Sequence, residues 1–265
     1  MSFGRFLGLA GAASLVFAAA AVAQTGTAPA ATAAPAEVAP VAETAPAPVA
    51  ELTEAHGPTQ AGNAKDGATK AAACAACHGV DGNSSDPQYP KIAGQHERFL
   101  ARQLALFKSG ERANPIMLGF AAPLTPQDMR DIGAHFAAQK ALGGIADDTV
   151  IAEGPNQGKK FYQVGERLWR GGDAARGIPA CMACHGPDGR GNPGPAYPAL
   201  AGQHAGYTAQ QLTAFRAGQV LGTGENANAV MAAVAKSLTD EEIQALSSYA
   251  QGLHTATGAD VAAKP

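Results

Sequence analysis

The chain has 265 residues, of which 15% are charged and 6% aromatic, and its formal net charge at pH 7 is −3. This balance is not typical of a nucleic-acid-binding protein, because phosphate recognition needs an excess of clustered Lys and Arg. The length allows two domains of about 90 residues after a leader, and domains of that size have little hydrophobic core of their own. Each therefore needs an additional source of stability.

The first 23 residues are typical of a secretory signal. Arg5 supplies a positive charge, residues 6–22 are uncharged, and a small-residue Ala-Val-Ala cleavage site ends at residue 23. The uncharged run is rich in alanine, which makes it a weak membrane span. The sequence therefore predicts export to the periplasm. Either the signal is cleaved, or residues 6–23 stay as a tether to the outer face of the inner membrane.

Residues 24–57 consist largely of Ala, Pro, Thr and Glu and contain no Lys or Arg. Such a segment cannot bury enough apolar surface to offset the entropy lost on ordering. We expect a disordered linker that its prolines keep partly extended. Whether it acts as a spacer or is a plain solvated leader stays open.

Two copies of the motif Cys-x-x-Cys-His contain all four cysteines, namely Cys74, Cys77 and His78 in the first and Cys181, Cys184 and His185 in the second. Spacings of three and four bring both sulfurs and the imidazole to one face of a helical turn. There the thiols can form thioethers to the vinyl groups of a haem, and the histidine becomes the proximal iron ligand. The sequence therefore predicts two covalently bound haem c groups.

Two other kinds of site use paired cysteines. A zinc finger needs four ligands at close spacing, but these pairs lie 107 residues apart and a histidine directly follows each. A thioredoxin-like pair belongs to an α/β protein, and no alternation of hydrophobic strands with helices is visible. Haem attachment is preferred to both.

The two motifs lie within a longer internal repeat. Residues 92–96, Ile-Ala-Gly-Gln-His, return at residues 200–204 as Leu-Ala-Gly-Gln-His, and Tyr-Pro precedes each copy. Apolar residues at helical spacing follow both copies, and each half ends in a capped helix that begins at Thr125 or Thr239. The pattern predicts two copies of one helical module.

The capped helices also locate a second ligand for each iron. Met117 and Met231 each stand seven residues before a matching leucine, Leu124 or Leu238, just ahead of the capped helix. We expect both methionines in a loop before the terminal helix, from which a thioether can reach the haem face opposite the proximal histidine.

Other residues compete for this role. Met129 falls on the apolar face of its helix and is expected in the core. Met182 lies between its two cysteines and is held on the proximal side. The repeated His96 and His204 leave ligation by two histidines open, although such a histidine more often bonds to the backbone.

The proximal histidine also needs an acceptor for its other ring nitrogen. Pro90 and Pro198 lie in stiff loops, and either present a backbone carbonyl for that purpose or are simple turn prolines. Lys108, Arg112 and Arg216 could meet haem propionates, but a solvated charge is the default expectation for each.

With these motifs, the chain resembles the dihaem cytochromes c4, which are tandems of two class I cytochrome c domains. The resemblance runs from Gly62 to Gln251 and is most distinctive in Cys-Met-Ala-Cys-His-Gly-Pro-Asp-Gly at 181–189 and in the two Tyr-Pro-x-x-Ala-Gly-Gln-His segments. It implies an all-α fold of two tandem cytochrome c-like helical domains, each around one covalent haem, with the haems close together across the domain interface. It assigns Cys74, Cys77, His78 and Met117 to the first haem, and Cys181, Cys184, His185 and Met231 to the second.

The expected organisation is a signal peptide or uncleaved anchor at 1–23, a disordered linker at 24–57, cytochrome c domain 1 at 58–142, an interdomain linker at 143–158, cytochrome c domain 2 at 159–256 and a disordered tail at 257–265. The long Ala/Pro-rich leader departs from the compact pattern of the resembling family.

The resemblance implies transfer of single electrons between periplasmic or membrane respiratory partners, from a donor to a terminal oxidase or another acceptor. His/Met ligation would fill both axial positions and leave no site for a substrate, so we expect an electron carrier and not an enzyme. One alternative is a cytochrome subunit of a periplasmic dehydrogenase, for example a sulfide-oxidising one. Another is a haem enzyme with one open iron site.

Overall fold

The computed structural model describes residues 60–224 and 227–254, so the predicted signal segment, the linker at 24–57 and the tail lie outside the described residues. Within these ranges the chain forms α-helices and short 3₁₀ helices joined by loops, with only isolated β-bridges. The all-α prediction is therefore confirmed. None of the helices in the described part has the length and hydropathy of a membrane span.

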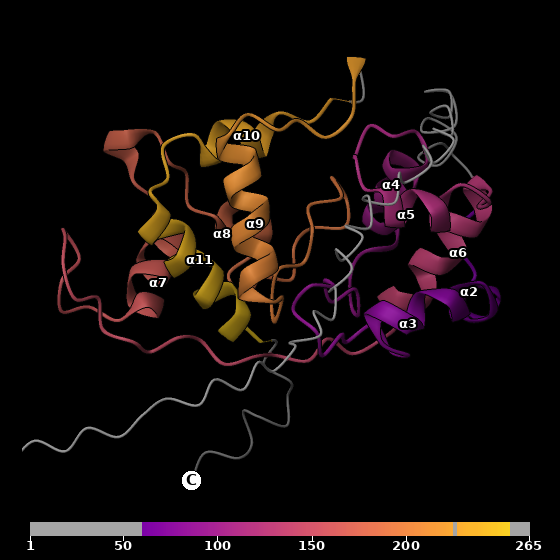
Figure 1. The fold of residues 1–265 in the computed structure, drawn as a ribbon, viewed down its shortest axis with the longest axis horizontal. Coiled ribbons are helices and arrows are strands. Elements are labelled where there is room, and N and C mark those ends of the chain that lie inside the picture. The colour runs from indigo at the N-terminus through magenta and orange to yellow at the C-terminus, as the bar shows by residue number, and fades with distance from the viewer. Residues whose placement is uncertain (1–59, 225–226, 255–265) are drawn as a thin grey trace, which may run out of the picture. The chain divides into compact units, whose positions relative to one another are not determined.

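The first module contains α2 (Ala64–Lys70), η1 (Ala71–Cys74), α3 (Ala75–His78), α4 (Glu97–Lys108), α5 (Pro115–Ala121) and α6 (Pro126–Ala137), which lie together in Figure 1. Asn63 caps α2 by accepting a hydrogen bond from the Lys65 amide. Thr125 and Asp128 form a capping box at the start of α6. The terminal helix α6 packs against both α2 and α4.

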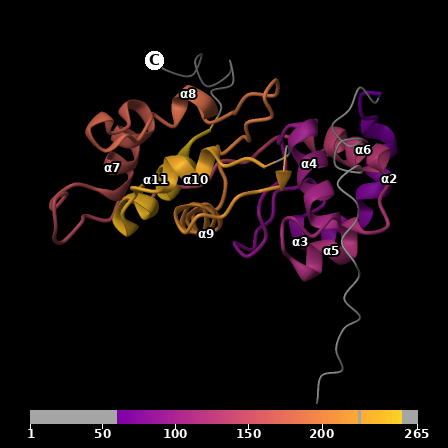
Figure 2. The same cartoon turned by 90° about the horizontal axis from the view of Figure 1, so that it is seen from above.

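The second module repeats this order with α7 (Phe161–Gly171), η2 (Ala174–Arg176), α8 (Met182–His185), α9 (Ala205–Arg216), α10 (Val230–Ala235) and α11 (Asp240–Gly252), seen from another side in Figure 2. Thr239 and Glu242 form the capping box of α11. This terminal helix packs against α7 and α9. The repeat in the sequence is thus a repeat of helix packing.

Each module has its own hydrophobic core. Met129 is 2% exposed and packs beside Leu106 in the first module, which confirms its prediction as a core residue. Trp169 is equally buried and lies in the core of the second module. Ile151 joins that core although it belongs to the segment 143–158 that we expected to be a linker.

A glycine lets the first and last helices of each module approach closely. A Cβ atom added to Gly67 of α2 would lie 1.9 Å from the Asp131 carbonyl oxygen of α6, and one added to Gly165 of α7 would lie 2.2 Å from the Ala245 carbonyl oxygen of α11. Real Cβ contacts are never this short, so any larger residue must push the helices apart. The crossing of these helices therefore depends on glycine.

We expect Gly165→Ala to lower the free energy of unfolding of the second module by about 1–3 kcal/mol, the usual cost of an overpacked core. The matched control is Gly171→Ala in the same helix, where the added Cβ has no heavy atom within 4 Å. This control should keep or slightly raise stability, because alanine favours helix. Denaturant unfolding followed by helical circular dichroism measures both variants, and equal midpoints for the two would contradict the expectation.

Candidate haem sites

The first Cys-x-x-Cys-His motif forms one continuous helical turn. Cys74 ends η1, and Cys77 and His78 lie in α3. Gly79 then ends the turn with a φ of +82°, a conformation that favours glycine. The buried His78 donates a hydrogen bond from Nδ1 to the carbonyl oxygen of Pro90, 2.8 Å away.

The second motif has the same geometry. His185 is buried at the end of α8, and its Nδ1 donates to the carbonyl oxygen of Pro198 at 2.9 Å. Trp169 packs beside it, with 6.3 Å between the ring centroids. The indole Nε1 of Trp169 is buried and has no hydrogen-bond partner among the described residues. It is a polar atom that a bound group could satisfy.

These contacts set the protonation of both proximal histidines. A carbonyl oxygen can only accept, so the Nδ1 of His78 and of His185 carries the proton and Nε2 keeps its lone pair. Burial lowers the pKa of both imidazoles, against a smaller opposing effect of the proline carbonyls, and so keeps them neutral. A neutral ring with a free Nε2 is the form that binds iron. Of the two alternatives left open for Pro90 and Pro198, the structure shows the backbone acceptor.

Among the described residues, the four cysteines are not part of any group that could hold a metal ion. All four are free, and only Cys184 is exposed. Burial raises the pKa of Cys181 to about 11 and also raises that of Cys74, so these sulfurs stay protonated at neutral pH. Within residues 60–224 and 227–254, no group of three or more His, Cys, Asp or Glu side chains could hold a metal ion. The zinc alternative therefore has no support in the described part of the chain.

The two methionines lie in short helices, which corrects the prediction of a loop. Met117 belongs to α5 and Met231 to α10, the helices directly before α6 and α11. Asn114 accepts a hydrogen bond from the Met117 amide and Pro115 fixes the first helical residue, so this segment begins a helix. Both side chains are half-buried. α5 packs on α4 and α10 packs on α9, so the two methionines hold corresponding places in their modules.

The two repeated histidines differ, because the buried Nε2 of His96 has no hydrogen-bond partner among the described residues. His204 donates from Nε2 to the carbonyl oxygen of Ser84 in the other module, at 2.9 Å. Burial lowers the pKa of both His96 and His204. The contact of His204 agrees with the expectation that such a histidine bonds to the backbone.

The three cations expected to be solvated instead bind protein groups. Lys108 donates to the Leu124 carbonyl at 2.9 Å, and Arg216 donates to the Leu238 carbonyl at 3.0 Å, in matching positions of the two modules. Arg112 reaches the other module, where it donates to the hydroxyl of Tyr207 at 2.9 Å. The default expectation was wrong because tertiary contacts supplied acceptors that no local pattern indicated.

Comparison with known proteins gives consistent matches. The sequence profile of the Cytochrome c family matches residues 64–138 and 157–254. Cytochrome c4 of Pseudomonas aeruginosa is 45% identical over 73% of this chain and 90% of its own length. A protein of Stutzerimonas stutzeri named thiosulfate dehydrogenase electron acceptor is 40% identical over 69% of this chain and 80% of its own. The crystal structure of reduced recombinant cytochrome c4 from Pseudomonas stutzeri has a TM-score of 0.65 and 45% identity, covering 73% of this chain and all of that one.

Two helical modules, each with a Cys-x-x-Cys-His turn and a buried neutral histidine, define a dihaem c-type cytochrome with two covalently bound haem c groups. The relatives identify the kind of c-type cytochrome. The chain belongs to the cytochrome c4 family and is an electron carrier that passes electrons between redox partners.

Proposed function

We propose that His78 and Met117 are the axial ligands of the first haem iron, and His185 and Met231 those of the second. Cys74 and Cys77 would attach the first haem, and Cys181 and Cys184 the second. The observation that carries this proposal is the duplication of the whole set. Each module pairs a buried histidine, whose Nε2 is free, with a methionine on the short helix before the terminal helix.

The haem groups supply a one-electron iron couple, and the protein residues control it. A methionine sulfur on one face of the haem and a histidine imidazole on the other favour a high reduction potential of the iron. With both axial positions filled, neither iron keeps a site for a substrate, and the protein acts as a carrier and not as an enzyme. Its donor and its acceptor, a terminal oxidase or another oxidant, would be periplasmic or membrane proteins. The proposed location is the periplasm, with a tether to the inner membrane if residues 6–23 are retained.

Carbon monoxide binding tests the carrier proposal against a haem enzyme. Carbon monoxide binds reduced haem iron only where an axial position is open or its ligand is easily displaced. We expect the reduced native protein to show no change in its optical spectrum on addition of carbon monoxide. A spectral shift that accounts for one of the two haems would support an enzyme with one open site and overturn the carrier proposal.

A second candidate is the electron acceptor of a particular dehydrogenase. It is favoured by the 40% identity to the thiosulfate dehydrogenase electron acceptor of Stutzerimonas stutzeri. A solved structure of a thiosulfate dehydrogenase from Marichromatium purpuratum also matches, with a TM-score of 0.58 and 35% identity, although this chain covers only 39% of it. Reduction of both haems by thiosulfate, only when a purified thiosulfate dehydrogenase is present, would support this narrower role.

A further inference from the structure

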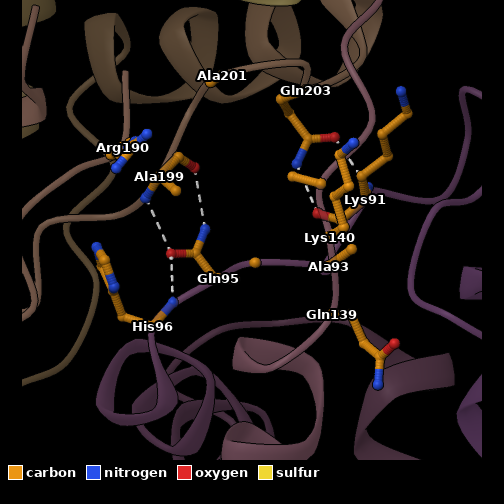
Figure 3. Close-up of a pocket in the computed structure, with 12 residues that line it drawn as sticks. Lys91, Ala93, Gln95, His96, Gln139, Lys140, Arg190, Ala199, Ala201 and Gln203 are labelled. Carbon is orange, nitrogen blue, oxygen red and sulfur yellow. Dashed lines mark hydrogen bonds between the residues drawn. The ribbon is translucent and has the colours of Figure 1, made fainter. Parts of the chain in front are cut away.

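Two glutamines join the modules through a reciprocal set of hydrogen bonds (Figure 3). Gln95 of the first module donates from Nε2 to the Ala199 carbonyl at 3.0 Å and accepts at Oε1 from the Ala199 amide at 2.9 Å. Gln203 of the second module donates to the Lys91 carbonyl at 2.8 Å and accepts from the Lys91 amide at 2.9 Å. Both glutamines are buried, with exposed fractions of 6% and 7%. The interface thus contains the same contact twice, once in each direction.

The contact of Gln203 leads to the proximal histidine of the other module. The amide N–H of Lys91 and the carbonyl of Pro90 belong to one peptide group. That carbonyl accepts the hydrogen bond from Nδ1 of His78 at 2.8 Å. A single peptide group of the first module is therefore bonded on one side to its own histidine and on the other to Gln203 of the second module.

The contact of Gln95 has the same form. The Ala199 amide and the Pro198 carbonyl form one peptide group, and that carbonyl accepts from Nδ1 of His185 at 2.9 Å. Each proximal histidine is therefore two hydrogen bonds away from a glutamine of the opposite module.

The two glutamines are fixed in orientation. Gly94 and Gly202, directly before them, have φ values of +67° and +73°. The amides of these glycines donate to the Phe136 carbonyl at 2.8 Å and the Ala250 carbonyl at 3.0 Å, near the ends of α6 and α11. Each glutamine Oε1 also accepts from the amide of the following histidine at 3.0 Å, which sets its oxygen toward the amides. Because each glutamine side chain is already held in place, it can polarise the neighbouring peptide group without a further loss of conformational entropy.

Hydrogen bonds in a chain strengthen one another, by about 10–30% per bond in condensed phases. An acceptor on a peptide N–H shifts electron density to its carbonyl oxygen, which then accepts more strongly from the histidine Nδ1–H. The imidazole becomes a more basic iron ligand, and outer contacts of this kind are known to tune metal centres. A more basic ligand favours ferric iron and lowers the reduction potential.

We propose that Gln203 tunes the haem of the first module through the Pro90–Lys91 peptide and His78, and that Gln95 tunes the haem of the second module through the Pro198–Ala199 peptide and His185. The proposal rests on the proximal ligands of the proposed function. Gln95 and Gln203 are positioning residues, because each acts through a peptide group and a histidine of the opposite module. The tuning is crossed, so the potential of each haem depends on contact with the other module.

The test replaces each glutamine by methionine in the full two-haem protein. Methionine has a similar size but neither accepts strongly nor donates. Gln203→Met should raise the potential of the first haem and leave that of the second, and Gln95→Met should do the reverse. A redox titration followed by NMR gives both potentials, and the ring N–H resonance of His78 or His185 identifies the haem that changes. That resonance should move toward the position of a weaker hydrogen bond.

Two further variants separate tuning from a merely structural role. Gln139 lines one pocket together with Gln95 and Gln203. Its Nε2 donates to the carbonyl of His135 in α6, in the same module, at 3.3 Å. Gln139→Met should shift neither potential. Gln203→Glu gives the Lys91 amide a stronger, charged acceptor and should lower the potential of the first haem below the native value. If Gln203→Met does not accumulate with two haems, Gln203→Glu still decides, because it should lower the first potential more than the second.

Three results would overturn the proposal. They are a shift in the potential of the haem in the substituted module, equal shifts in both potentials, and no shift in either. The near-infrared band of the Met–ferric bond is recorded in the native protein and in every variant. Its absence from the native protein would contradict the proposed methionine ligands, whereas its presence with uncrossed shifts would contradict only the tuning.

Discussion

A protein with Cys74→Ser and Cys77→Ser is expected to carry one covalent haem in place of two. A haem c is held by two thioethers from one Cys-x-x-Cys-His motif, and serine oxygen does not form this bond to a haem vinyl. The intact mass after maturation should therefore fall by one haem relative to the native protein. The matched variant, Cys181→Ser with Cys184→Ser, should also lose one haem and keep the other.

The loss should also weaken the first module. Cys74 packs against a core cluster that includes Leu100, Ile132 and Phe136. In a domain this small the haem supplies a large share of the apolar contacts, so its loss exposes that cluster. The helical content of the first module should fall while the second keeps its haem and its spectrum. Loss of both haems, or of neither, would contradict independent attachment at the two motifs.

The parts of each site that depend on a few neighbouring residues were predictable from the sequence. The Cys-x-x-Cys-His spacing forms one helical turn in both modules, and the proline that accepts from the proximal histidine lies only 12 or 13 residues further on. The internal repeat also aligned Leu124 with Leu238, which placed Met117 and Met231 at matching positions just before the terminal helices. Local spacing and duplication were enough for these features.

Features that depend on the interface between the modules were not predictable. The repeat included Gln95 and Gln203, but only the folded structure places each beside a peptide of the opposite module. The bond from Arg112 to Tyr207 joins residues 95 positions apart and has no sequence signal. The helical state of α5 did have one, because Asn114 and Pro115 form a cap and a first helical residue. This capping pattern could have predicted a helix around Met117 in place of the loop.

The axial ligands can be tested by changing each methionine to histidine. Met117→His should lower the potential of the first haem, and Met231→His that of the second, because imidazole nitrogen favours ferric iron more than thioether sulfur does. Covalent attachment should persist, since the cysteines are unchanged. Redox titration of the purified variants should give one shifted and one native potential in each case. The intensity of the near-infrared band of the Met–ferric bond should fall to half of its native value in each variant.

Met129 provides the control, because it lies in the same module but is buried in the core with an exposed fraction of 2%. Met129→Leu conserves volume, so it should cost less than about 1.5 kcal/mol of stability and leave the near-infrared band and both potentials unchanged. Met117→Leu removes the proposed ligand and should abolish the band of the first haem. The reverse result, with the band lost in Met129→Leu and kept in Met117→Leu, would show that the terminal helix itself carries the ligand. The short helix α5 would then serve only to cover the haem.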